Sequence, residues 1–194
     1  MTSPSAYAGF RRLPILHGTI LTRMGRPRKS EGEAESAPPG RALSAAFRML
    51  SRRALSEGEI RFRLEAKGFT EAQAADVLIR LRELGLVDDQ ALCADLARTY
   101  RDIRRQGPRR IAGALCLRRF PRDLVDQSVR AAFRPGEELA AAASALGKKF
   151  RDGIPEGRAG AAKAFRFLSG RGFSPQICRQ AIRVLPGDIE EGER

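Results

Sequence analysis

Arginine side chains crowd the sequence between residues 98 and 130. Arg109 and Arg110 fall in the first turn of a helix that Pro108 opens, where the helix dipole disfavours cations. Cations in such a place indicate a partner outside the chain, because guanidinium groups pair bidentately with phosphate and carboxylate groups. Further arginines flank this turn: Arg98, Arg101, Arg104, Arg105, Arg118, Arg119 and Arg122. We interpret the stretch as a phosphate- or carboxylate-binding ridge, and an ordinary solvated basic surface is the alternative.

Residues with catalytic or metal-binding chemistry are few. The single histidine, His17, lies in a stretch without sustained periodicity, so catalytic triads and His-containing metal sites are not expected. Asp88 and Asp89 could bind Mg²⁺, but their position just before a predicted helix favours capping of that helix by one of them. Three cysteines fall at apolar positions of helical patterns: Cys93, Cys116 and Cys178. We therefore expect buried thiols in a cytoplasmic protein, with no metal, no cofactor and no enzymatic activity.

The composition favours helices and an acidic partner. The chain of 194 residues has 42% hydrophobic and 6% aromatic residues and no tryptophan, which favours helices over sheets. Its formal net charge of +13 predicts attraction to polyanions or acidic protein surfaces. The sequence has no run of about twenty apolar residues, so we expect no membrane span.

Residues 56–86 predict two short helices folded back on each other. Ser56 with Glu59, and Thr70 with Gln73, match the capping box, in which two side chains satisfy the free amides of a helix start. Apolar residues then recur three or four positions apart, as on one face of a helix. The segment therefore predicts a helical hairpin.

The hairpin pattern returns twice, with Phe69, Phe120 and Phe173 at equivalent positions 51 and 53 residues apart. A period of about fifty residues is typical of helical arrays, whose copies share a core because one hairpin cannot bury its apolar face alone. A further helix is predicted before each hairpin, over residues 41–53, 90–105 and 137–150. Residues 152–160, which contain three glycines, predict a longer loop.

The predicted domain organisation follows from these patterns. It comprises a disordered basic tail rich in Pro and Gly (1–40), three three-helix units (41–87, 88–134 and 135–186) and a frayed acidic tail (187–194). Within the first tail, residues 24–29 resemble the core of an AT-hook, which lies in the minor groove of A·T-rich DNA. We favour a solvated basic tail, because a single short match is weak. A further hypothesis is that translation begins at Met24.

Three segments, in this order, carry a family resemblance. They are Arg53-x-x-Ser56-x-x-Glu59-Ile60-x-x-x-Leu64-x-x-Lys67-Gly68-Phe69, Leu84-Gly85-Leu86-Val87-Asp88-Asp89 and Gln106-Gly107-Pro108-Arg109-Arg110-Ile111-x-x-x-Leu115. Their ordered combination resembles the RecX regulators of the bacterial recombinase RecA, over roughly residues 43–185.

The resemblance implies an all-α fold, an elongated and curved array of three tandem three-helix units. It further implies a monomeric, cytoplasmic regulatory protein that is not an enzyme. Such a protein binds the RecA filament on single-stranded DNA and mainly inhibits the recombinase, ATPase and co-protease activities of RecA in DNA repair and the SOS response. Direct contact with nucleic acid, filament capping and groove coating all stay open. The alternative is a sequence-nonspecific helical DNA-binding protein.

Carried over to this sequence, the resemblance places the best candidate contact at Gly107-Pro108-Arg109-Arg110. The flanking candidates are Arg104, Arg105, Arg118 and Arg119, and the secondary candidates, on the equivalent turn of the first unit, are Arg63 and Lys67. One departure from the family pattern stands before Phe120, where Arg118-Arg119 replaces the typical Lys-Gly. We expect a remodelled helix end at that turn.

Overall fold

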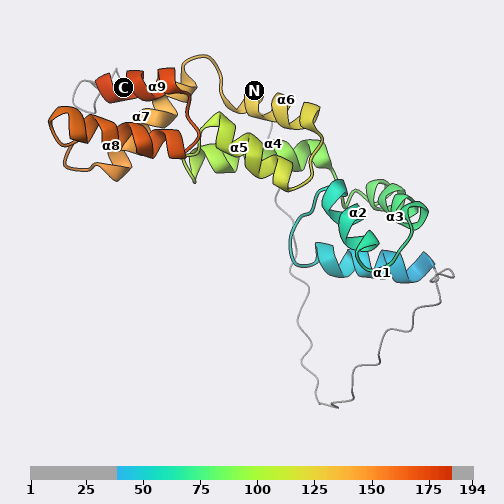
Figure 1. The fold of residues 1–194 in the computed structure, drawn as a ribbon. Helices are drawn as coiled ribbons and strands as arrows, with labels where there is room; N and C mark the ends of the chain where they lie inside the picture. Colours follow the sequence, from blue (N-terminus) through green and yellow to red (C-terminus); the bar gives the residue numbers. More distant parts are fainter. Residues whose placement is uncertain (1–38, 185–194) are drawn as a thin grey trace, which may run out of the picture. The chain divides into compact units, whose positions relative to one another are not determined.

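The computed structural model describes residues 39–184, and every regular element in that range is an α-helix (Figure 1). The nine helices of this range are α1 (Pro39–Leu50), α2 (Glu57–Glu65), α3 (Glu71–Glu83), α4 (Asp89–Asp102), α5 (Pro108–Leu117), α6 (Arg122–Ala132), α7 (Glu137–Lys149), α8 (Gly157–Gly170) and α9 (Pro175–Arg183). The predicted all-α fold is confirmed. The first predicted tail ends too late, because its last two residues, Pro39 and Gly40, already belong to α1. The rest of that tail, the acidic tail, the AT-hook-like stretch and the hypothesis of a start at Met24 concern residues outside the described range. Among the described helices, none has the length and apolar character needed to cross a membrane.

Each consecutive set of three helices has its own hydrophobic core, and we call α1–α3, α4–α6 and α7–α9 the first, second and third units. In each unit, two residues four positions apart on the middle helix are completely buried: Ile60 and Leu64, Ile111 and Leu115, and Ala164 and Leu168. Each fully buried Leu or Ile side chain contributes about 1.5–3 kcal/mol to stability. The apolar spacing in the sequence therefore identified the inner face of all three middle helices.

The helix starts follow the predicted capping chemistry. Ser56 Oγ accepts the Glu59 N–H at 3.0 Å, and the Glu59 carboxylate accepts the Ser56 N–H at 3.2 Å. Thr70 and Gln73 form the second predicted box in the same way. At α4 the capping residue is Asp88, whose Oδ1 accepts the N–H of the third helical residue at 2.9 Å.

The turn inside each hairpin has the same geometry in all three units. Gly68, Arg119 and Gly172 occupy equivalent positions with φ angles of 88°, 61° and 88°. In each turn, the N–H of the following phenylalanine donates to the carbonyl five residues earlier, at 3.2, 3.4 and 3.2 Å, which closes the helix in the usual left-handed manner. The prediction of a remodelled helix end at Arg118-Arg119 is therefore wrong: Arg119 adopts the left-handed conformation that glycine adopts in the other two units.

Three predicted boundaries also differ from the structure. The helix predicted over residues 41–53 spans Pro39–Leu50, so it starts and ends earlier. Helix α4 ends at Asp102 and not near residue 105, because Arg105 has a left-handed φ of 50° that turns the chain toward α5. Helix α8 already begins at Gly157, so the loop predicted over residues 152–160 is shorter. Gly160 lies inside α8, where an added Cβ would come within 1.7 Å of the Pro155 carbonyl oxygen. This glycine permits close packing of the preceding loop on the helix.

The thiols and acidic side chains of the described residues do not gather into a candidate metal site. Cys93 and Cys178 are buried, as predicted, but Cys116 is exposed, because it lies on α5 beside the inward-facing Leu115 and points away from the core. Burial raises the pKa of Cys93 and of Cys178, so both favour the neutral thiol. In the range 39–184, no group of three or more His, Cys, Asp or Glu side chains is placed to hold a metal ion.

Candidate binding surface

The start of α5, predicted as the main contact, lies against the turn between α8 and α9. The Gly107 N–H donates to the Arg171 carbonyl at 2.8 Å, and the Arg109 N–H donates to the Gly172 carbonyl at 3.2 Å. A Cβ added to Gly107 would lie 2.6 Å from the Gly172 carbonyl group. The backbone of the predicted contact segment is therefore a joint between the second and third units, and its glycine is required for that close approach.

An equivalent joint connects the first and second units. The Ser56 hydroxyl donates to the Arg118 carbonyl, and a Cβ on Gly58 would lie 2.3 Å from the Arg119 carbonyl oxygen. In both joints, the residue that caps the middle helix of one unit donates to the carbonyl that ends the middle helix of the next unit. The sequence analysis did not find either joint, because the partner segments are about sixty residues apart in the chain.

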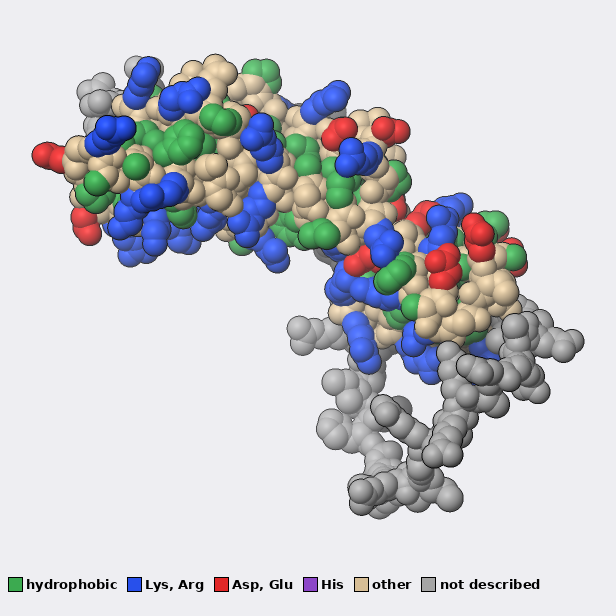
Figure 2. Space-filling model, viewed as in Figure 1, with side chains coloured by type: hydrophobic (Ala, Val, Ile, Leu, Met, Phe, Trp, Pro, Cys, Tyr) green, Lys and Arg blue, Asp and Glu red, His purple; other side chains and the backbone are tan. Residues whose placement is uncertain are grey.

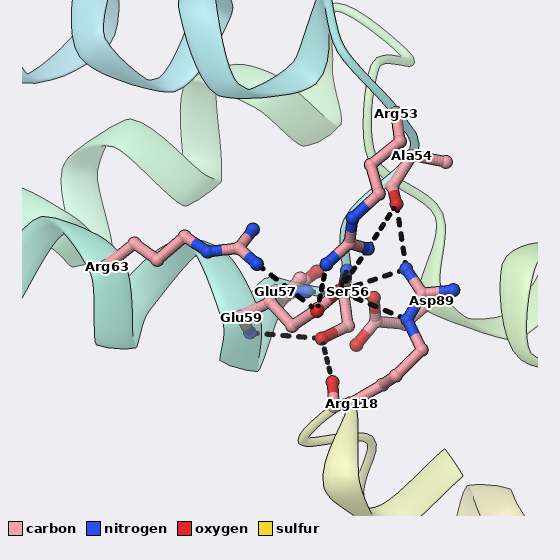
Figure 3. A network of polar contacts seen from close by, with 8 residues as sticks. All are labelled: Arg53, Ala54, Ser56, Glu57, Glu59, Arg63, Asp89 and Arg118. Carbon is pink, nitrogen blue, oxygen red and sulfur yellow. Dashed lines mark hydrogen bonds and ion pairs between the residues drawn. The ribbon is translucent and has the colours of Figure 1, made fainter. Parts of the chain in front are cut away.

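Arg118 was predicted to flank the contact, but its side chain belongs to this first joint (Figure 3). Only 16% of the side chain is exposed, and its guanidinium donates to Glu59 Oε2 at 2.9 Å and to the Ala54 carbonyl at 2.7 Å. Arg53 pairs with the other Glu59 oxygen at 2.6 Å, and Arg63 approaches it at 3.6 Å. Glu59 thus gathers three arginines, two of which the sequence analysis had placed on an outward-facing surface.

The electrostatics of Glu59 follow from this arrangement. Burial on its own would raise the pKa of the carboxyl group. Hydrogen bonds from Arg53, Arg118 and the Ser56 N–H together outweigh burial and lower the pKa of Glu59 to about 2. The carboxylate is therefore ionised at neutral pH and holds Arg118 in the joint.

Asp89 supports the same joint from α4. Its Oδ1 accepts the Glu57 N–H at 2.9 Å, so an α4 side chain satisfies a free amide at the start of α2. The Glu57 carboxylate in turn forms two hydrogen bonds with Arg82, at 2.6 and 3.0 Å. Burial raises the pKa of Asp89, opposed by the bond from the Glu57 N–H. The pair Asp88-Asp89 thus caps two different helices, α4 and α2.

Several of the predicted arginines gather at the second joint, together with one that was not predicted. We call this set the α5-start cluster: Arg104, Arg105, Arg109, Arg110 and Arg171. Arg109 is exposed and makes no side-chain hydrogen bond or ion pair with any residue between 39 and 184. Arg110 is also exposed, and its guanidinium donates to the Gly170 carbonyl at 2.6 Å. The α5-start cluster therefore presents guanidinium groups on a backbone that the joint holds rigid.

The remaining members of the cluster are fixed by neighbours. The Arg104 guanidinium lies over the Tyr100 ring at 4.7 Å, and its carbonyl accepts a hydrogen bond from Arg171. Arg105 is half-buried, and its Nε lacks a partner within the described part of the chain. Arg171 was missed by the sequence analysis, although it occupies the position in its hairpin turn that Arg118 occupies in the preceding one.

A second basic area lies on the first unit, in a hollow that we call the α1 hollow. Its cations are Arg41, Arg48, Arg52, Arg53, Arg63 and Lys67. The predicted residues Arg63 and Lys67 thus lie beside α1, whose arginines the sequence analysis did not select. Their spacing was a usable signal, because positions 41, 48 and 52 fall on one face of a helix. The last predicted residue, Arg119, is exposed with its guanidinium 3.7 Å from the centre of the Phe62 ring.

Figure 2 shows Lys and Arg side chains around α8 and α5, and again over α1 in the first unit. The structure therefore divides the predicted site residues into three sets. Arg104, Arg105, Gly107, Pro108, Arg109 and Arg110 lie at the second joint, Arg118 and Arg119 lie at the first joint, and Arg63 and Lys67 line the α1 hollow.

Comparison with known proteins shows similarity to RecX regulatory proteins. Models of the first and the third three-helix domains of RecX match residues 42–81 and 136–182. The regulatory protein RecX of Deinococcus radiodurans is 34% identical over 194 residues, which cover 90% of this chain and 92% of that protein. The regulatory protein RecX of Thermus thermophilus is 35% identical over 152 residues, which cover 78% of this chain and 95% of that protein.

Solved structures show the same fold. The crystal structure of RecX from Lactobacillus salivarius superposes with a TM-score of 0.65 at 19% identity, over 76% of this chain and 96% of that one. A second crystal structure, of a regulatory protein RecX, gives a TM-score of 0.62 at 23% identity, over 74% of this chain and 72% of that one.

Proposed function

Because the chain belongs to the RecX family of regulatory proteins, we propose that it binds the RecA–DNA filament and inhibits RecA. The inhibited activities would be recombination, DNA-dependent ATP hydrolysis and the co-protease activity that triggers the SOS response. The protein acts by binding alone, as a cytoplasmic monomer on RecA filaments formed on single-stranded DNA.

The observation that supports this proposal is the exposed α5-start cluster. Arg109 and Arg110 extend from a backbone that hydrogen bonds hold against the α8–α9 turn, so the backbone of both residues is in place before a partner arrives. A fixed backbone lowers the entropy cost of binding, and guanidinium groups match carboxylates and phosphates. Both groups are present on a filament of protein and DNA.

The mechanism follows from differential affinity. A regulator that binds one filament geometry more tightly than another shifts the filament toward that geometry. Cations from successive units, at the α5-start cluster and the α1 hollow, would contact successive acidic groups of the polymer. Inhibition of RecA then requires no reaction by the regulator itself.

The proposal is tested by the double substitution Arg109→Glu and Arg110→Glu. We expect unchanged helicity by circular dichroism and loss of inhibition in a RecA ATPase assay on single-stranded DNA, together with loss of co-sedimentation with preformed filaments. The matched control is Arg179→Glu with Arg183→Glu, which reverses two exposed charges on α9 that belong to neither the α5-start cluster nor the α1 hollow. Inhibition that survives in the folded double variant removes the α5-start cluster from the proposed site.

The second candidate function is sequence-nonspecific DNA binding, which the net charge of +13 favours. Filter binding to bare duplex DNA across a salt series, with a parallel RecA ATPase assay, separates the two functions. Tight duplex binding without any effect on the RecA ATPase would favour this second candidate.

A further inference from the structure

The hairpin turn of the first unit lacks the neighbour that its counterparts have. In the third unit, a Cβ added to Gly172 would lie 2.4 Å from the backbone nitrogen of Arg110, which belongs to the second unit. In the second unit, the Arg119 carbonyl oxygen lies against Gly58 of the first unit. A Cβ added to the equivalent Gly68 would meet nothing within 4 Å. The later two turns thus each receive the start of a middle helix, and the turn at Gly68 receives none from residues 39–184.

The exposure of the three turns differs in the same way. The phenylalanines that follow them, Phe120 and Phe173, are 5% and 1% exposed, whereas Phe69 is half-buried. Lys67 and Gly68 are exposed, and their carbonyls accept no hydrogen bond from the described residues. The corresponding carbonyls of the later turns accept the hydrogen bonds of the two joints. The first turn therefore keeps the acceptors of a joint without its donors.

The α1 hollow surrounds this free turn. Two parts of the hollow, of about 730 and 640 Å³, both have Lys67 in their walls. Arg41, Arg48 and Arg52 are exposed, and none of them forms an ion pair with a residue in the range 39–184. Helix α1 itself has no acidic residue. The turn thus has room for a further segment beside it, and the surrounding charge favours a segment with carboxylates.

The first joint shows which kind of segment fits such a turn. The Ser56 hydroxyl donates to the turn carbonyl, and Gly58 permits the close approach of the two backbones. The Glu59 carboxylate pairs with Arg118, whose equivalent in the first turn is Lys67. A fitting segment is therefore the start of a helix with a donor at its cap, a small residue in its first turn and a carboxylate at its third position.

A second copy of this chain has no free segment of this kind. Ser56 and Gly107 begin two of the middle helices, and both are engaged in joints. Gly160 is the equivalent residue of the third unit, because it also precedes the first buried residue of its middle helix by four positions. The place of a neighbouring turn is filled there by Pro155, whose carbonyl oxygen would lie 1.7 Å from a Cβ on Gly160. The third unit thus closes its end of the array with its own chain, as terminal units of repeat proteins do.

We propose that the α1 hollow is a docking site for the acidic start of a helix of another protein. The docked helix takes the position that a preceding unit would have, with its first amides on the carbonyls of Lys67 and Gly68 and its carboxylate on Lys67. This contact differs from the proposed filament contact at the α5-start cluster, so either proposal can fail without the other.

The probe is a peptide of residues 54–66 of this chain, which contains the helix start that already fits the equivalent turn. Because isolated short helices are marginally stable, Arg61→Lys is joined to Glu65 by a lactam on the exposed face. Binding to the full chain is followed by NMR, and we expect the amide signals of Gly68 and Phe69 to shift. Peptides with Glu59→Gln or Gly58→Leu are the matched controls, and we expect each to bind about ten-fold more weakly.

The protein variant Arg52→Glu with Lys67→Glu should lose the peptide, with about ten-fold weaker binding or less. The variant Arg179→Glu with Arg183→Glu changes the net charge equally and should bind like the unsubstituted chain. Circular dichroism confirms that each variant is folded.

Three outcomes would overturn the proposal. The first is equal binding of the peptide and its two controls. The second is a set of shifts confined to Arg119 and Phe120, because the peptide would then displace α2 of the chain itself from the first joint. The third is self-association in sedimentation experiments that Lys67→Glu abolishes, because the occupant of the hollow would then be a second copy.

Discussion

Arg118 and Glu59 meet across the joint of the first and second units, with Arg118 Nη2 2.9 Å from Glu59 Oε2. Both side chains are largely buried, at 16% and 9% exposure. Burial strengthens the hydrogen bonds of such a pair and makes either partner costly to leave alone. The pair is therefore a structural contact, although Arg118 lies beside solvent-facing arginines in the sequence.

We expect Arg118→Ala to lower the free energy of unfolding by about 2–3 kcal/mol, because it removes one of the two donors to the Ala54 carbonyl and leaves Glu59 with fewer partners. Urea unfolding followed by circular dichroism measures the change. Arg122→Ala is the control, since Arg122 is exposed at the start of α6, just after the same turn, and we expect a change within about 0.5 kcal/mol. Equal effects of the two substitutions would contradict the structural role of Arg118.

The lowered pKa of Glu59 predicts that the free energy of unfolding falls at acid pH. Its pKa is lowered from the ordinary 4.5 to about 2 in the folded chain, so its stabilising contribution is complete above about pH 4.5 and is lost as the pH falls toward 2. The contribution amounts to at most about 3 kcal/mol. The pKa of Asp89 is shifted upward, which acts in the opposite direction: its contribution is present at low pH and is lost as the pH rises. Urea unfolding at several pH values should show a shallower acid decline for Glu59→Gln than for the unsubstituted chain, and parallel declines would contradict this assignment.

Arg119 occupies the left-handed position that glycine occupies in the other two hairpins. Replacement by Ala removes the contact with the Phe62 ring but keeps the backbone strain, whereas replacement by Gly removes both. We therefore expect Arg119→Gly to be more stable than Arg119→Ala by about 1 kcal/mol. Thermal unfolding of the two variants measures the difference, and a less stable glycine variant would contradict the strain.

Gly107 and Gly113 provide a matched pair within or beside α5. A Cβ on Gly107 would overlap the Gly172 backbone, while a Cβ on Gly113 meets nothing within 4 Å. We expect Gly107→Ala to destabilise the chain by about 1–3 kcal/mol. Gly113→Ala should stabilise it by about 0.5–1 kcal/mol, because alanine restricts the unfolded chain and favours the helix. If Gly107→Ala were also stabilising, the close contact between the units would be absent in solution.

The local features of the fold could be predicted because their signals lie within a few residues. Capping by Ser56 and Thr70 and the buried faces of the middle helices depend on spacings of three or four positions. The end of α4 could not be predicted in this way, because Arg105 turns the chain in a conformation that its residue type does not favour.

The joints could not be predicted from local spacing, since Ser56 and Arg118 are 62 positions apart. Nothing in the sequence distinguishes Arg118, which pairs with Glu59, from Arg119, which lies over the Phe62 ring. The sequence therefore predicted a set of basic residues near three turns. It did not predict which of these arginines form structural contacts and which face solvent.

Helix α5 takes part in both joints, one at each end. Its start, at Gly107, contacts the third unit, and the turn at its end, at Arg118, contacts the first. Ten residues of α-helix span about 15 Å and resist compression. A ligand that displaced one end of α5 would therefore move the other end with it. Ligand binding at the third unit would in this way shift the contact of α5 with the first unit.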